Sequence, residues 1–120
     1  MASHGTQEER QRQLEAIIEA AMQRTLQAVA AAQPRITHHT FHGAVGIDPQ
    51  HLATWYIFKT DAELLEAARN GLLGSVSART RAELRAGGYP DSAIEQVGVS
   101  FTSAEDIERA AGGNWYQYFK

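Results

Sequence analysis

The chain has 120 residues, 43% of them hydrophobic and 21% charged, which suits one soluble globular domain with a hydrophobic core. Its formal net charge of −3 gives no strong attraction to nucleic acid or anionic lipid, so we expect neither as a partner. The lack of cysteine excludes a disulfide framework, a thiol nucleophile and a zinc–thiolate site.

The N-terminal region shows no targeting signal. It has no basic lead followed by an apolar run, and its longest purely apolar stretch, residues 28–32, is too short to span a bilayer. We therefore expect a cytoplasmic protein, a location that suits a chain without cysteine. Residues 1–5 are small and unpatterned and are predicted to be disordered, which leaves residues 6–120 as a single α+β domain.

A long amphipathic helix is predicted over residues 7–32. Thr6 and Glu9 have the spacing of a capping box at its start, and Pro34 ends the helical pattern. The pattern is not a sustained heptad, so we expect the helix to cover one face of a sheet or to pair with its counterpart in a homodimer. One face of it carries Leu14, Ile17, Ile18, Ala21, Thr25 and Val29.

Two strands are predicted next, over residues 35–45 and 52–59, with a turn between them. The second strand is apolar on both faces, which is typical of a central strand that is covered on both sides. Its faces carry Leu52, Tyr56 and Phe58 on one side and Trp55 and Ile57 on the other.

A repeated pattern predicts two β–α units. Residues 58–68 align without gaps to residues 101–111, and both read as the end of a strand, a hydroxyl cap, an acidic first turn and a helix. Thr60 and Glu63 form a capping box, and Ser103 opens the second helix. Each unit is therefore expected to be a strand that turns sharply into a helix packed back on the sheet.

The first of these helices is expected to bend or break and to resume over residues 77–86. Glycines within residues 70–74 interrupt it, because an interior glycine costs about 1 kcal/mol relative to alanine. The second helix is expected to stop at residues 112–113, which are both glycine. Because β–α–β connections favour parallel strands, residues 52–59 and 97–102 are predicted to pair in parallel.

The C-terminal residues 114–120, Asn-Trp-Tyr-Gln-Tyr-Phe-Lys, alternate like a terminal strand. With this strand the order of elements is α-β-β-α-β-α-β. The predicted fold class is therefore α+β, with a mixed four-stranded sheet, a long N-terminal helix and two helices from the β–α units.

The histidines of the first strand are the first candidate site. Ligand nitrogens must converge on zinc at about 2.0–2.1 Å, whereas residues on a strand alternate faces and rise about 3.3 Å each. His38 and His42 therefore share a face about 13 Å apart along the strand, and His39 points to the opposite face. We expect no metal or other cofactor, and a small enzyme or ligand-binding site using His38, His42 and His51, with Tyr56 or a nearby carboxylate, is the alternative hypothesis.

The starts of the two β–α helices are a second candidate, because helix N-termini bind anions. Each helix end offers about half a positive charge, whereas the two first turns already carry Asp61, Glu63, Glu105 and Asp106. These carboxylates are predicted to cap the helix ends themselves, so no phosphate site is expected.

The aromatic C-terminus is the third candidate. On a strand, Trp115 and Phe119 would complete the core, and Tyr116 and Tyr118 would lie half-exposed on the other face. Tyrosine supplies much contact area at low entropic cost, so Tyr116 and Tyr118 are candidate binding residues.

The sequence contains no nucleophile elbow, phosphate loop or His-Glu-x-x-His motif. The leading hypothesis is therefore a non-enzymatic interaction protein. It would bind a protein partner through a sheet edge and exposed tyrosines, or assemble as a homodimer through the N-terminal helix.

Overall fold

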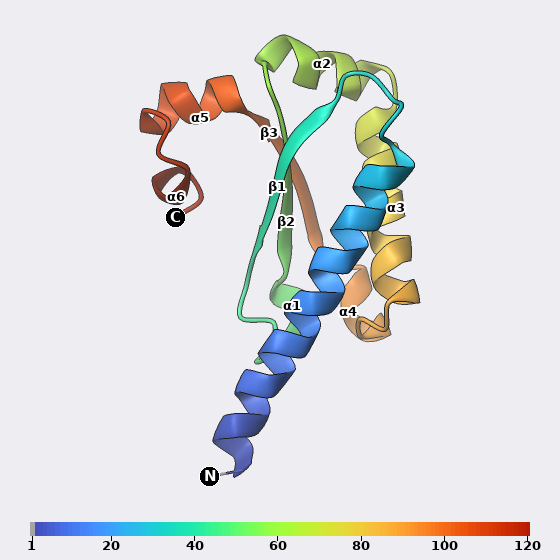
Figure 1. Ribbon diagram of the computed structural model, residues 1–120, viewed down its shortest axis with the longest axis vertical. Coiled ribbons are helices and arrows are strands. Elements are labelled where there is room, and N and C mark those ends of the chain that lie inside the picture. The colour runs from blue at the N-terminus through green and yellow to red at the C-terminus, as the bar shows by residue number, and fades with distance from the viewer. Residues whose placement is uncertain (1) are drawn as a thin grey trace.

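A three-stranded mixed sheet lies at the centre of the computed structural model, which describes residues 2–120 and the side chains from Thr6 onward (Figure 1). Strand β1 is antiparallel to β2, and β2 is parallel to β3, in the order β1-β2-β3. The predicted parallel pairing and the central position of β2 are therefore confirmed. The strands are β1 (Ile36–His42), β2 (Ala53–Phe58) and β3 (Gly98–Ser103).

Helices lie against both faces of this sheet. Helices α1 and α3 pack together on one face, and α5 and α6 lie on the other (Figure 1). Helix α2 crosses one end of the sheet, and α4 lies beside the 3-10 helix η1 at the other end. Within residues 2–120, no helix combines the length and the apolar composition needed to cross a bilayer. The helices are α1 (Ala2–Ala28), η1 (Pro49–His51), α2 (Asp61–Arg69), α3 (Leu72–Ala86), α4 (Asp91–Ile94), α5 (Ala104–Ala111) and α6 (Trp115–Tyr118).

The predicted fourth strand is wrong, because the C-terminal segment forms helix α6 and the sheet has three strands rather than four. The Asn114 side chain caps this helix by accepting a hydrogen bond from the backbone N–H of Gln117 at 3.0 Å. Gly112 and Gly113, with φ of 60° and 82°, turn the chain back over the face of the sheet and away from its edge. A short alternating pattern does not distinguish a strand from one helical turn, and here the cap and the glycine pair determine the conformation.

Helix α1 differs from its prediction at both ends. It ends at Ala28 rather than at residue 32, and it begins at Ala2, so Thr6 lies inside the helix rather than at its N-cap. Its apolar stripe is buried within the same chain, which leaves the polar face of α1 for contact with a second copy. The buried stripe consists of Leu14, Ile18, Ala21, Met22 and Thr25. The predicted disorder concerns residues 1–5. Met1 and the side chains of residues 2–5 lie outside the described part of the chain, and the backbone of residues 2–5 belongs to α1.

The two β–α units begin as the sequence predicts. The Thr60 hydroxyl accepts a hydrogen bond from the Glu63 N–H at 3.1 Å, and the Glu63 carboxylate accepts one from the Thr60 N–H at 3.2 Å. In the second unit, the Ser103 hydroxyl accepts a hydrogen bond from the Asp106 N–H at 2.9 Å. The predicted break in the first helix is confirmed at Gly71, whose φ is 87°, since α2 ends at Arg69 and α3 starts at Leu72. The predicted resumption at residue 77 is wrong, because α3 runs without interruption from Leu72 to Ala86.

The core contains tyrosine hydroxyls that all find partners. The Tyr56 hydroxyl lies 2.7 Å from Thr80 Oγ1, which in turn donates to a backbone carbonyl of α3. The Tyr89 hydroxyl donates to the carbonyl oxygen of Pro49 at 2.5 Å, and burial raises the pKa of Tyr89 to about 12. The described part of the chain has no buried side-chain nitrogen or oxygen that lacks a hydrogen-bond partner.

We predict that Tyr89→Phe lowers the free energy of unfolding by about 1 kcal/mol, the usual net contribution of one hydrogen bond. It should also reduce the loss of stability at alkaline pH. Because the pKa of Tyr89 is raised from 10.0 to about 12 by folding, the stability it contributes is lost as the pH rises through that interval. Urea unfolding at neutral and alkaline pH tests this, with Tyr116→Phe at an exposed position as the control. Equal alkaline losses in Tyr89→Phe and the wild type would contradict it.

Candidate functional site

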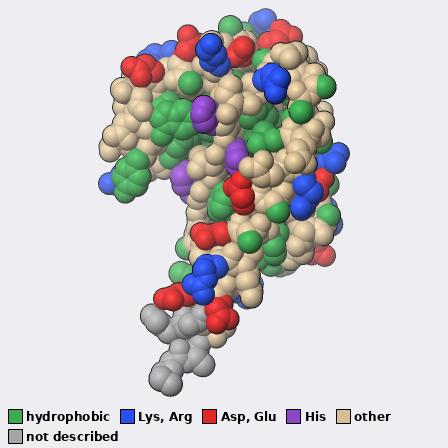
Figure 2. Space-filling model, in the orientation of Figure 1, with side chains coloured by type: hydrophobic (Ala, Val, Ile, Leu, Met, Phe, Trp, Pro, Cys, Tyr) green, Lys and Arg blue, Asp and Glu red, His purple; other side chains and the backbone are tan. Residues whose placement is uncertain are grey.

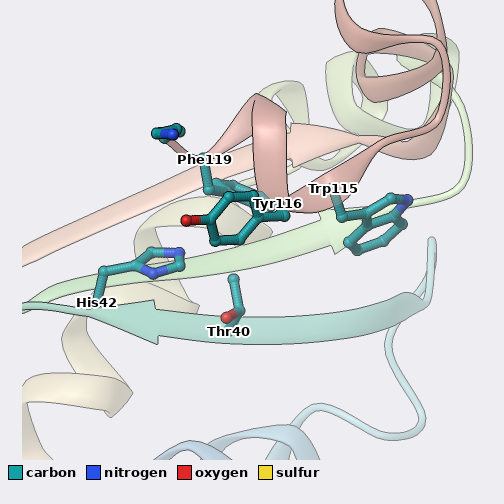
Figure 3. Close-up of a pocket in the computed structure, with 6 residues that line it drawn as sticks. Thr40, His42, Trp115, Tyr116 and Phe119 are labelled. Carbon is teal, nitrogen blue, oxygen red and sulfur yellow. The ribbon is translucent and has the colours of Figure 1, made fainter.

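A pocket of about 260 Å³ opens between β1 and α6. Two walls face one another across it: side chains from β1 on one side and aromatic rings from the C-terminal segment on the other (Figure 3). The structure thus brings together two groups that the sequence analysis considered separately, the histidine strand and the terminal aromatics. The pocket is lined by Thr40, His42, Trp115, Tyr116, Phe119 and Lys120.

The alternation of β1 determines which histidines reach the pocket side of the sheet. The His38 ring packs edge-on against Trp115, with ring centroids 4.9 Å apart, and the His42 ring lies 5.4 Å from that of Phe119. On the opposite face, His39 Nε2 lies 2.9 Å from Glu19 Oε2 of α1. His38 and His42 therefore share a face and His39 points away from it, as the strand geometry predicts.

The three histidines of the enzyme hypothesis do not converge. His51 lies in η1, where its Nε2 is 3.8 Å from Asp48 Oδ2, and it does not line the pocket. Tyr56, the other residue of that hypothesis, points into the core on the α1 face and bonds to Thr80. In the described part of the chain, no three His, Asp or Glu side chains are grouped so that they could hold a metal ion. The arrangement offers His42 to the pocket as a packing and hydrogen-bonding group without a carboxylate partner among the lining residues.

Phe119 is the centre of the aromatic contacts that hold the C-terminal segment on the sheet. Its ring packs edge-on against Trp55 of β2 at 5.2 Å and against Tyr118 at 5.0 Å, and it lies 6.5 Å from the ring of Trp115. Tilted and edge-on aromatic pairs each contribute about 0.5–1.5 kcal/mol beyond the area that they bury. These contacts, rather than backbone pairing, attach the segment to β1 and β2.

The two candidate tyrosines have different environments, because a helix places them on different sides. The Tyr116 side chain is 75% exposed, and the Lys120 ammonium lies 5.5 Å from its ring centroid. The Tyr118 hydroxyl lies 2.7 Å from Thr102 Oγ1 and donates a hydrogen bond to Asp106. Burial and the hydrogen bond to Asp106 raise the pKa of Tyr118. Tyr116 is therefore available to a ligand, whereas Tyr118 anchors α6.

The acidic first turns of α2 and α5 form a network that continues from Tyr118. Asp106 also accepts a hydrogen bond from Arg109 at 2.7 Å, and Arg109 reaches Asp61 at 3.0 Å. The Ser103 hydroxyl donates to Asp61 at 2.5 Å. The hydrogen bonds from Tyr118 and then from Arg109 lower the pKa of the Asp106 carboxyl, so its stabilising contribution is lost as the pH falls through that lowered pKa. The carboxylates are thus engaged within the chain.

The outer edge of β1 borders the pocket. Within the described chain, no backbone hydrogen bond joins residues 36–42 to an element other than β2. The strand contains no lysine and no proline, the residues that commonly block pairing at sheet edges. Figure 2 shows histidine side chains at the surface beside a hydrophobic patch. An unpaired strand edge and a pocket therefore lie next to each other.

Four residues that line the pocket were not predicted from the sequence to be site residues: Thr40, Trp115, Phe119 and Lys120. Thr40 could have been found from its alternation with His38 and His42, whereas the other three depend on the path of the chain after Gly113. Comparison of the chain with protein families, curated proteins and solved structures found no match.

We predict that the fluorescence of Trp115 reports on its contact with His38. In the Trp55→Phe variant, which leaves Trp115 as the single tryptophan, adding His38→Ala should shift the emission maximum of Trp115 to longer wavelength. The physical reason is that the His38 ring, 4.9 Å from that of Trp115, covers part of the indole, and its removal exposes the indole to water. His42→Ala, whose ring packs on Phe119 instead, should leave the emission maximum of Trp115 largely unchanged. An unchanged emission maximum after His38→Ala would refute the contact.

Proposed function

We propose that the protein is a non-enzymatic interaction protein that binds an extended segment of a protein partner along the outer edge of β1. One large side chain of that segment would occupy the pocket between β1 and α6. The observation that carries this proposal is the position of the open strand edge directly beside a pocket with an exposed aromatic residue, Tyr116. A cytoplasmic location, expected for a chain without cysteine, belongs to the same proposal.

An extended segment is the natural ligand of an unpaired strand edge. Its backbone N–H and C=O groups would pair with those of β1, as in other cases of strand addition to a sheet. Side chains of an added strand alternate between faces, so every second one would lie on the side of Thr40 and His42. Backbone pairing would supply affinity, and the pocket would select which side chain is accepted.

The size of the pocket favours a single anchoring side chain. Its volume of about 260 Å³ is below the range of about 300–1,000 Å³ that is usual for sites holding whole small molecules. Interface hot spots are enriched in Trp, Tyr and Arg and cluster in well-packed pockets from which water is excluded. Tyr116 has the properties of such a contact residue, since its large ring is already exposed and has few rotatable bonds to immobilise.

A second copy of the chain is the other occupant that an open edge would accept, through antiparallel pairing of two β1 strands. A homodimer through α1 has less support, because the apolar stripe of α1 is buried against its own chain. The partner segment and the second copy are separated by the experiments below.

We predict that Tyr116→Ala weakens binding of selected peptides by about tenfold or more, as expected for loss of a hot-spot aromatic. The peptides would be selected from a random phage-displayed library on the immobilised protein, and their affinities would be measured by fluorescence anisotropy. Leu65→Ala, at an apolar position on α2 that is 50% exposed, is the matched control and should leave the affinities unchanged. Selected peptides that bind equally well to Tyr116→Ala, or a failure to select any, would contradict the proposal.

We further predict that a bound peptide protects backbone amides of residues 36–42 from hydrogen exchange, because strand addition forms hydrogen bonds on that edge. Native mass spectrometry of the free protein, before and after washing with a chelator, accompanies this measurement and gives the number of chains in the free protein. A mass of one chain, with protection appearing only on addition of peptide, supports the partner segment. A dimer whose β1 amides are protected without peptide would replace the partner segment by a second copy. If the peptide protects amides of other elements alone, the edge of β1 is not its binding site.

A further inference from the structure

The two helices on the pocket side of the sheet are attached in different ways. Ile107 of α5 is fully buried, and Ile57 of β2, which points to the same side, is fully buried as well. No residue of α6 is buried. Helix α5 is therefore part of the folded body, whereas α6 rests on it through partly exposed side chains.

The connection between these helices has the character of a hinge. Gly112 and Gly113 are consecutive and both adopt left-handed backbone conformations, with φ of 60° and 82°. A Cβ atom placed on Gly112 would have no neighbour within 4 Å, and one on Gly113 would meet only the carboxylate end of Glu108. The direction of the chain at this point is set by backbone hydrogen bonds from the N–H groups of residues 112, 113 and 114 to carbonyl oxygens of α5, at 2.9, 3.4 and 3.0 Å. Rotation at this point breaks only these bonds, and glycine allows the backbone to adopt the new angles.

The side-chain contacts that hold α6 in place are made with the sheet and with α5. One is polar: the Tyr118 hydroxyl bonds to Thr102 of β3, which is 4% exposed, and to Asp106 of α5. The others are ring contacts, of Trp115 with His38 and of Phe119 with Trp55 and His42. The Tyr118 hydroxyl therefore makes the polar contacts of the closed position, and the ring contacts supply its apolar part.

We propose that α6 is a hinged jaw of the pocket, which swings about Gly112 and Gly113 to admit a partner's side chain and closes on it when Tyr118 bonds to Thr102 and Asp106. One wall of the pocket, formed by Thr40 and His42, belongs to the sheet and stays in place. The other wall belongs to α6, so its movement changes the width of the pocket directly (Figure 3). The inference deepens the proposed function and rests on it for the identity of the ligand, but the motion is measurable without any ligand.

Hydrogen exchange of the free protein tests the motion. The amides of Tyr118 and Phe119 are hydrogen-bonded within the C-terminal segment, to Asn114 and Trp115 at 3.0 and 3.1 Å. If α6 opens locally, their protection factors should be lower than those of α5 by about 100-fold or more, since a locally opening unit exchanges without global unfolding. Protection of α6 equal to that of α5 would overturn the jaw.

Variants that remove the hydroxyl of Tyr118 or of Thr102 distinguish a hinged jaw from ordinary fraying of a chain end. Tyr118→Phe and Thr102→Val should each lower the protection of α6 by about tenfold, as loss of one hydrogen bond would, while α5 keeps its protection and so shows that the fold is intact. Thr102→Ser retains the hydroxyl and should retain the protection. Insensitivity of α6 to both Tyr118→Phe and Thr102→Val would overturn the proposal, because fraying of a chain end does not depend on these hydroxyls.

The selected peptides connect the jaw to binding. Tyr118→Phe should raise their dissociation rate several-fold with little change in association, because the closed position is weakened while the edge of β1 is untouched. If Tyr116→Ala has no effect on any peptide but Tyr118→Phe still releases α6, the proposed function fails and the jaw stands. If peptides depend on Tyr116 but neither α6 exchange nor peptide dissociation responds to Tyr118→Phe, the jaw fails and the proposed function stands.

Discussion

The rest of the structure depends on one constraint: the central strand β2 is apolar on both faces and must be covered on both. Tyr56 and Phe58 are fully buried on one side, and Ile57 is fully buried on the other. An apolar side chain of this size contributes about 1.5–3 kcal/mol when buried, so leaving either face open to water would cost much of the stability of a small domain. Each neighbouring element can be understood as a cover for one face or a partner for one edge of β2.

The two faces of the sheet are covered by different amounts of packed side chains. On the Tyr56 side, α1 and α3 pack a continuous core around the buried Tyr56–Thr80 hydrogen bond. On the Ile57 side, α5 supplies Ile107, and rings of the C-terminal segment cover Trp55 and the histidines of β1. The pocket of the proposed site lies on this shallower side, between β1 and the aromatic residues that follow Gly113. Stability is thus concentrated on one face of the sheet, and the proposed binding site lies on the other.

The histidines of β1 are best understood as surface on which aromatic rings pack. The His38 ring meets Trp115 edge-on and the His42 ring lies tilted against Phe119, and both imidazoles have nitrogens that can form hydrogen bonds. A leucine at the same positions would pack equally well but would make the edge strand more apolar and more prone to pairing with other chains. A histidine-rich edge strand is therefore compatible both with a monomer in solution and with selective strand addition, which is the behaviour that the proposed function requires.

Much of the architecture was determined by the sequence itself, because its causes are local. Thr60, Glu63 and Ser103 cap their helices through side chains a few residues away, and glycine at position 71 breaks the helical pattern where it stands. The apolar faces of residues 53–58 placed that strand in the centre, and strand alternation placed His38 and His42 on one face. The C-terminal fold and the site were decided by the tertiary structure. Residues 114–120 alternate like a strand, yet the contacts of Tyr118 with Thr102 and of Phe119 with Trp55 hold them over the sheet as a helix. Thr40 and Phe119 line one pocket although they are far apart in the sequence, and no periodicity encodes the distance between two elements. That distance is set by the packing of Phe119 on Trp55 and the bond from Tyr118 to Asp106, contacts that exist only once the chain has folded.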